Sequence, residues 1–174
     1  MTVYVALIRA INVGGSGTLA MAELKALAEE IGLSEVSTHI QSGNLIFRSP
    51  EPADVVAARL DAALGRKLGK PPGVFLRSRA ELDAVVANNP FGHAQPSQVL
   101  VTFLGLPAGE DALHGLVAPD GEEVVAIGRE IYVHYPIGSG RTRLKLPILK
   151  QGTARNINTV TRLSGLAAQL EARP

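Results

Sequence analysis

The sequence predicts an α+β protein made of two ferredoxin-like halves, β-α-β-β-α-β followed by β-α-β-β, the second ending in an extra C-terminal helix. Three observations support this class. The first strand is apolar on both faces, which is typical of a strand at the centre of a covered sheet. Strand and helix patterns then follow in the ferredoxin-like order, and the order partly recurs further along. At 174 residues, with 46% hydrophobic and 19% charged residues, the chain is long enough to bury a core.

The first half is predicted over residues 1–78. Alternation and helical periodicity give, in order, a strand Val3–Ala10, a helix Met21–Ile31, strands Val36–Gln41 and Leu45–Arg48 joined by the hairpin Ser42–Asn44, a helix from Glu51 to about Leu68, and a strand Val74–Arg77. Gly32 is expected to end the first helix, and the Gly69–Gly73 segment to end the second.

A connecting helix and hinge are predicted over residues 79–97, and the second half over residues 98–174. The expected elements are a helix Arg79–Val86, a hinge Gly92–Pro96, a strand Gln98–Leu104, a short helix Glu110–Val117, strands Glu123–Ile127 and Glu130–Tyr135, a loop Gly138–Arg143, and a final helix. In that helix Ile157, Val160, Leu163, Ala167 and Leu170 form the apolar stripe, and Asn156 is the expected N-cap.

Composition excludes several kinds of chemistry. The chain has no cysteine, which excludes disulfides, thiolate catalysis, cysteine-ligated zinc and iron–sulfur clusters. Its four histidines are scattered without metal-ligand spacing, so no metal and no cofactor is expected. No apolar run is long enough to cross a membrane and no cleavage signal follows the first strand, so a cytoplasmic protein is expected.

A polar ligand site is predicted where the first strand and the hairpin end. The segment Gly15–Ala20 matches a dinucleotide-binding fingerprint, but the second strand ends without an acid and leads into a hairpin, which argues against that fold. The first two strands are expected to be parallel, because a helical crossover joins them. Their ends then bring together Asn12, Gly14, Gly15, Gln41, Ser42, Gly43 and Asn44. The alternative is that these side chains only fix the loops by local hydrogen bonds.

A second group of candidate residues lies in the basic C-terminal tail. Residues 137–174 carry seven Lys or Arg and one acid, a net charge of +6, whereas the first 136 residues carry −5. By helical spacing, one face of the final helix carries Arg155, Asn158, Thr159 and Arg162, with Arg141 as a third basic arm. Arginines at a helix N-terminus suit a phosphate or a carboxylate. The alternative is a structural clamp in which Arg155 pairs with acidic residues.

Three motifs resemble those of the bacterial family catalogued as domain of unknown function 1697. They are Leu7–Gly15 before Met21–Leu24, Ile40–Asn44, and Gly152–Asn156 with Asn158–Val160. The resemblance runs from the first strand to the last helix and implies the two ferredoxin-like halves, but no activity, substrate or cofactor. It also implies that the family's characteristic residues fall on Arg9, Asn12, Gly14, Gly15, Gln41, Ser42, Gly43, Asn44, Arg141, Thr153, Arg155, Asn156 and Thr159.

The chain departs from the family pattern at three places. Ala10 stands where a glycine is usual, Ile157 where many members have tryptophan, and the lysine often found in the first glycine turn is missing from Ser16–Thr18. The change at Ile157 removes an aromatic side chain suited to base stacking.

Together these observations favour a small binding protein that takes an anionic or phosphorylated ligand in a polar cleft between its halves. Scarce aromatic residues and a total net charge of only +1 give weak support for nucleic acid as the partner. One alternative is a metal-independent hydrolase or transferase acting on a phosphorylated metabolite, for which Ser42 and His39 are the nearest candidate pair. The other is a structural or self-associating protein; the sequence does not fix the oligomeric state.

Overall fold

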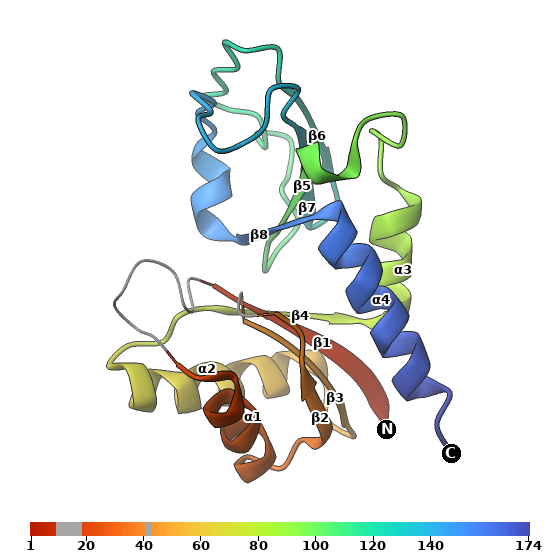
Figure 1. Ribbon diagram of the computed structural model, residues 1–174. Helices are drawn as coiled ribbons and strands as arrows, with labels where there is room; N and C mark the ends of the chain where they lie inside the picture. Colours follow the sequence, from red (N-terminus) through yellow and green to blue (C-terminus); the bar gives the residue numbers. More distant parts are fainter. Residues whose placement is uncertain (10–18, 41–42) are drawn as a thin grey trace. The chain divides into compact units, whose positions relative to one another are not determined.

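The computed structural model describes residues 1–9, 19–40 and 43–174. The chain forms two compact units (Figure 1): the first comprises Met1–Asp83 with Leu163–Pro174, and the second comprises Ala84–Arg162. Each unit contains one four-stranded antiparallel sheet. The predicted combination of helices with antiparallel strands, ending in a C-terminal helix, is confirmed.

The sheet of the first unit has the order β2-β3-β1-β4. Its strands are β1 (Thr2–Ile8), β2 (Ser34–Thr38), β3 (Asn44–Ser49) and β4 (Val74–Ser78). β1 pairs with β3 and β4 on its two sides and is buried from Val3 to Ile8. The apolar character of both faces of this strand therefore reflects a central position, as predicted.

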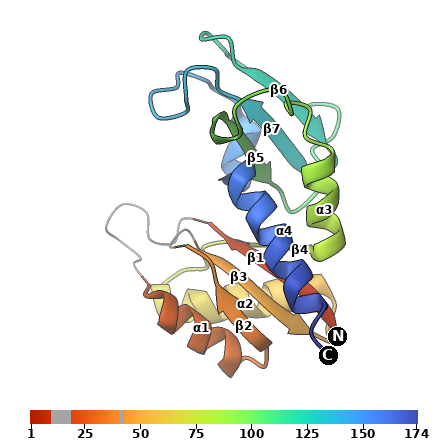
Figure 2. The same ribbon diagram turned by 45° about the vertical axis from the view of Figure 1, so that its right-hand side comes forward.

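Helices α1 (Met21–Glu30) and α2 (Ala53–Leu68) cover one face of this sheet, as Figure 2 shows. Their buried leucines, with Ala28 and Val56, form one core cluster with Tyr4, Ala6 and Ile8 of β1. α2 ends at Gly69, whose backbone is left-handed (φ 95°) and whose N–H donates to the carbonyl of Gly65. Glycine adopts this conformation without the steric cost that a side chain would add.

The last turns of the C-terminal helix α4 (Ile157–Glu171) belong to the first unit. Arg48 of β3 holds them: its Nη2 donates to the carbonyl of Leu170 at 2.5 Å and to that of Arg173 at 2.9 Å. Its Nε lies 2.9 Å from Oε2 of Glu35. A cation near the last carbonyls of a helix is stabilising, because the helix dipole has its negative end there.

The sheet of the second unit has the order β6-β7-β5-β8. Its strands are β5 (Val99–Phe103), β6 (Glu123–Ile127), β7 (Glu130–His134) and β8 (Thr153–Asn156). Helix α3 (Arg79–Ala87) passes from the first unit into the second, and the hydroxyl of Tyr132 donates to the carbonyl of Val85 at 2.7 Å. Two short 3-10 helices, η1 (Pro96–Gln98) and η2 (Pro147–Gln151), precede β5 and β8.

Two elements of the second half differ from the prediction. The expected helix Glu110–Val117 is wrong, because residues 110–115 form successive turns. A segment of eight residues offers too few helical hydrogen bonds to offset nucleation on its own. The strand β8 was not predicted, since Thr-Ala-Arg-Asn has no alternation of apolar and polar residues.

The predicted start of the final helix is correct in one respect. Asn156 caps it, since its Oδ1 accepts a hydrogen bond from the backbone N–H of Thr159 at 2.9 Å. No helix in the described part of the chain is long and apolar enough to cross a membrane.

Candidate functional site

Three segments of the first unit meet where β1 ends. The N–H of Ile8 donates to the carbonyl of Gly43 at 2.9 Å, and the N–H of Arg9 donates to the carbonyl of Gly73 at 3.0 Å. Because β3 is antiparallel to both β1 and β2, β1 and β2 are parallel. Their C-terminal ends therefore lie at the same end of the sheet, as the sequence predicted.

Arg9 lies against the turn that leads into β4. Its Nε donates to the carbonyl of Pro72 at 3.2 Å, and a Cβ atom placed on Gly73 would lie only 3.4 Å from that nitrogen. The N–H of Gly73 in turn donates to Oδ1 of Asp61 at 2.9 Å. A half-buried guanidinium therefore lies at this end of the sheet, where the resemblance had already pointed to Arg9.

The side chain of Asn44 holds the turn between β2 and β3. It is fully buried, and its Nδ2 donates to the carbonyl of His39 at 3.0 Å while the N–H of His39 donates to the carbonyl of Asn44 at 3.2 Å. These contacts give Asn44 a local structural role, which was the alternative to ligand binding.

Of the residues predicted at this end of the sheet, Gly43 and Asn44 lie beside the end of β1, next to Ile8 and Leu7 respectively. Asn12, Gly14, Gly15, Gln41 and Ser42 lie outside the described residues, and with Ser42 so does one member of the Ser42–His39 pair.

Arg155 is the most deeply buried of the predicted basic residues, with 7% of its surface exposed. It lies in β8 opposite Val101 of β5. Its Nη1 donates to Oγ1 of Thr153 at 2.7 Å and to the carbonyl of Ala154 at 2.9 Å. Burial lowers the pKa of Arg155 to about 10, because a charged group loses solvation in the protein interior.

The predicted helical face that joined Arg155 to Arg162 is wrong, since Arg155 belongs to β8 and α4 begins two residues later. Asn158, Thr159 and Arg162 do share the first two turns of α4. Asn158 and Arg162 are exposed and one turn apart, so both face solvent on neighbouring positions of the helix.

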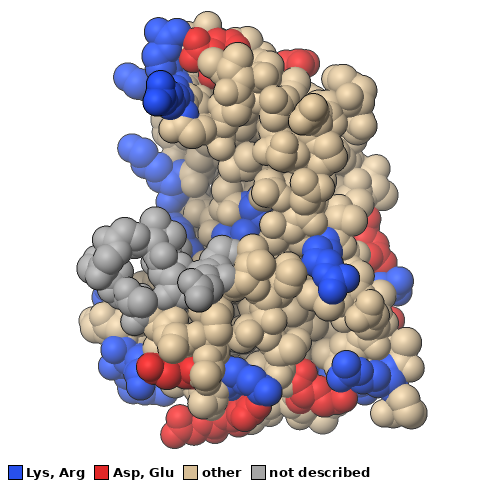
Figure 3. Space-filling view, viewed as in Figure 1, with Lys and Arg blue, Asp and Glu red and all other residues tan. Residues whose placement is uncertain are grey.

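Basic side chains gather on the segment 138–151 of the second unit. Arg141, Arg143, Lys145 and Lys150 are all exposed, and Figure 3 shows Lys and Arg atoms clustered where Figure 1 draws this segment. Within the described residues, the side chain of Arg141 makes no hydrogen bond or ion pair. It can therefore contact an anion from solution, but the loop does not shield the guanidinium from water.

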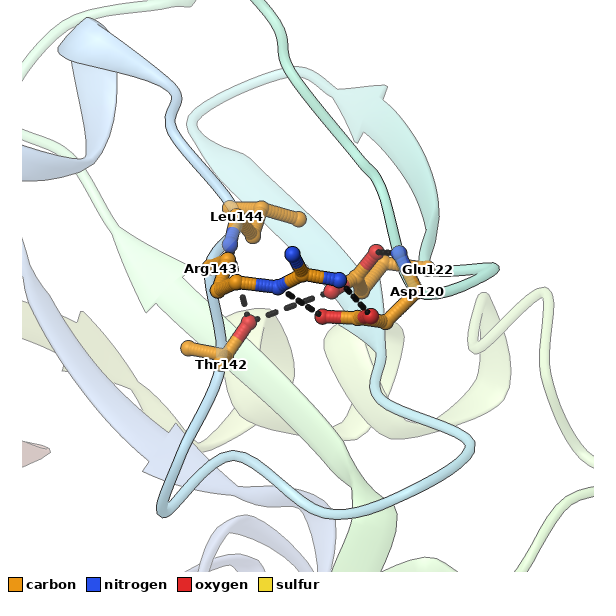
Figure 4. A network of polar contacts seen from close by, with 5 residues as sticks. All are labelled: Asp120, Glu122, Thr142, Arg143 and Leu144. Atoms are coloured by element: carbon orange, nitrogen blue, oxygen red, sulfur yellow. Dashed lines mark hydrogen bonds and ion pairs between the residues drawn. The ribbon is translucent and has the colours of Figure 1, made fainter.

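The neighbouring Arg143 has an internal role, which Figure 4 shows. Its Nη2 lies 2.6 Å from Oδ1 of Asp120, and its Nε donates to Oδ2 of the same carboxylate at 3.3 Å. This hydrogen bond lowers the pKa of Asp120 and raises the pKa of Arg143. Glu122 completes the network by accepting hydrogen bonds from the hydroxyl of Thr142 at 3.2 Å and from the N–H of Asp120 at 2.9 Å.

Sequence reasoning did not find the role of Thr153, which orients the Arg155 guanidinium. The spacing of two residues would have placed both side chains on one face, had the segment been recognised as a strand. Among the residues that the structure describes, no group of three or more His, Asp or Glu side chains is placed to hold a metal ion.

Comparison with known proteins connects the chain to a family and a fold. The model of a family described as "Protein of unknown function (DUF1697)" matches residues 1–132. Among solved structures, the chain is similar to a conserved bacterial protein, SP0830 of Streptococcus pneumoniae, with a TM-score of 0.79 and 24% identity over 95% of this chain and 98% of the other. No curated protein matches it. The chain therefore belongs to the DUF1697 family of proteins of unknown function.

Proposed function

We propose that this protein binds a small molecule carrying a phosphate or carboxylate group, and that Arg155 is its principal cationic contact. The observation that carries the proposal is the guanidinium of Arg155, buried in β8 and fixed by Thr153 and Ala154. The strand order β6-β7-β5-β8 supports the ferredoxin-like description of the half that holds it.

The depressed pKa of Arg155 is the energetic basis of the proposal. A shift from 12.5 to about 10 corresponds to about 3 kcal/mol by which burial disfavours the charged guanidinium. An oxyanion that reaches the guanidinium offsets part of this cost, because the attraction between opposite charges is stronger where water is excluded.

The geometry of β8 supports a prearranged site. Two hydrogen bonds to atoms of the same strand orient the guanidinium, so less side-chain entropy is lost when a ligand binds. The 15-residue helix α4 begins two residues after Arg155. Its first turn carries Asn158 and Thr159, and the positive end of a helix dipole favours an anion.

The direct test is calorimetric titration of the full chain with inorganic phosphate, adenosine monophosphate and a dicarboxylate, with the thermal midpoint as a second readout. We expect Arg155→Met to weaken binding by roughly 10- to 100-fold, the range for a charge-assisted hydrogen bond. The matched control is Arg66→Met, which removes an exposed arginine of α2 and is expected to change nothing.

A second variant guards against a folding defect in Arg155→Met. Thr153→Val keeps the arginine and removes only the hydroxyl that orients it, so it should weaken binding several-fold. Arg155→Lys keeps the positive charge but not the guanidinium, and it should not reach the affinity of the wild type. The proposal is overturned if the wild-type protein binds none of these anions, or if a folded Arg155→Met variant binds them as tightly as the wild type.

A further inference from the structure

Each sheet of the protein ends in two edge strands. In the first unit these are β2 and β4, and in the second they are β6 and β8. An edge strand presents backbone N–H and C=O groups to which a further strand can bind, and proteins usually protect such edges with bulges, charged side chains or proline.

Three of the four edges carry protective features. β2 has an irregular register between Ser34 and Ser37, with Glu35 between them at a positive φ of 48°. β4 carries the buried charge of Arg77, and β8 carries that of Arg155. Inward-pointing charges of this kind disfavour edge pairing, because a shift in strand register would either expose the charge or leave it buried without a partner.

β6 has no such protection. After Glu123 its sequence is Val-Val-Ala-Ile, without charge, proline or an irregular register. Each of these four residues is partly exposed. A strand of this composition is the kind that pairs readily with a further strand.

The register of β6 determines which of its backbone groups face outward. A two-residue turn with Gly128 at φ 58° joins β6 to β7, so Ile127 and Glu130 form the closing pair. In such a hairpin the closing pair and every second pair beyond it exchange hydrogen bonds. Val125 and Glu123 therefore bond to β7, while the N–H and C=O groups of Val124 and Ala126 point to the open edge.

We propose that β6 pairs antiparallel with β6 of a second copy of this chain, about a two-fold axis at Val125. In this register Val124 lies opposite Ala126 of the second copy, and the outward N–H and C=O groups of both residues are satisfied. Val125 lies opposite its own symmetry mate, and the two sheets become one sheet of eight strands.

Self-pairing suits this strand because its two ends are complementary. Glu123, with 62% of its side chain exposed, lies opposite Ile127 of the second copy, which leads into the turn that carries Arg129. The acidic start of one β6 therefore meets the basic turn at the end of the other, and opposite charges attract. A two-fold axis repeats this contact at both ends, and the apolar residues between them cover one another.

The test is the oligomeric state of the full chain, measured by sedimentation equilibrium over a wide range of concentrations. We expect a concentration-dependent dimer. Val125→Lys and Val125→Glu each place two like charges at the axis, and each should weaken the dimer by at least roughly tenfold. An equimolar mixture of the two variants should form a heterodimer, a recovery that a folding defect would not give.

Two further variants separate pairing from general surface effects. Ala126→Pro removes an outward N–H without touching the bonds to β7, and should also weaken the dimer. Val55→Lys makes the same substitution at an exposed position of α2 in the first unit, and should leave the dimer unchanged. A wild-type protein that stays monomeric at every concentration, or a dimer that Val125→Lys does not weaken, overturns the proposal.

Discussion

Gly152 lies where β8 begins beside β5, and its replacement by alanine is the sharpest test of this part of the structure. Its backbone is extended, with φ −132° and ψ −166°, so any residue can adopt its conformation. The restriction is space. A Cβ atom at this position would lie 2.2 Å from the carbonyl oxygen of Phe103 and 2.9 Å from Cγ2 of Thr102.

The size of the effect follows from that distance. Carbon and oxygen atoms in close contact are normally about 3.3 Å apart, so one strand must move by roughly 1 Å. The obstructing atom is backbone and cannot rotate away. Overpacking of this kind costs about 1–3 kcal/mol. Losing the adjoining pair of Phe103 with Thr153 adds about 1 kcal/mol per hydrogen bond. We therefore expect a loss of about 2–4 kcal/mol in the free energy of unfolding.

Gly165 provides the matched control within the same chain. It lies inside α4, and among the described residues no atom beyond the backbone of its own helix lies within 4 Å of the place that a Cβ atom would take. Alanine is favoured over glycine in a helix interior by about 0.5–1 kcal/mol, so Gly165→Ala should stabilise the protein.

Urea unfolding followed by circular dichroism measures both variants, and hydrogen exchange of the β8 amides locates the change in Gly152→Ala. If Gly152→Ala is as stable as the wild type and keeps its β8 protection, the close approach of β8 to Phe103 is refuted.

Substitutions at three other residues test individual contacts. Asn156→Ala should cost about 1 kcal/mol by removing the cap of α4, and Asn156→Ser should restore most of it; thermal unfolding measures both. Arg48→Met removes hydrogen bonds to the carbonyls of Leu170 and Arg173 and should cost about 1.5–3 kcal/mol, with the α4 amides near the C-terminus losing exchange protection first. Burial raises the pKa of Tyr132 above its usual 10. The buried neutral phenol therefore stabilises the fold below pH 10. This stabilisation is lost as the pH rises, because the tyrosine ionises first in the unfolded chain. Tyr132→Phe should flatten the fall in stability measured above pH 10; an unchanged alkaline profile would contradict this.

The elements of the first unit were predictable because their signals are local. β1 reads as apolar on both faces and is central, and the ends of α1 and α2 coincide with glycines that stop a helix. The parallel direction of β1 and β2 followed from the helical crossover between them. These features depend on period and chain connectivity, both of which are visible in one dimension.

The second half was harder because its irregular segments carry weak signals. Residues 105–117 pack onto the sheet through Ala108, Ala112 and Leu116, whose spacing of four suggests a helix that the chain does not form. β8 is recognisable only by its neighbour, since Thr153–Asn156 has no strand pattern of its own and depends on pairing with β5.

The sequence alone determined the class of fold, the central strand, the cap at Asn156 and the basic character of the C-terminal tail. Each of these depends on residue type and spacing. Only the tertiary structure decided that Arg155 lies in a strand with its guanidinium buried, that Arg143 is bound to Asp120, and that β6 presents an unprotected edge. Burial, ion pairing and strand order all depend on which distant segment lies alongside, and that is set by the packing of the whole unit.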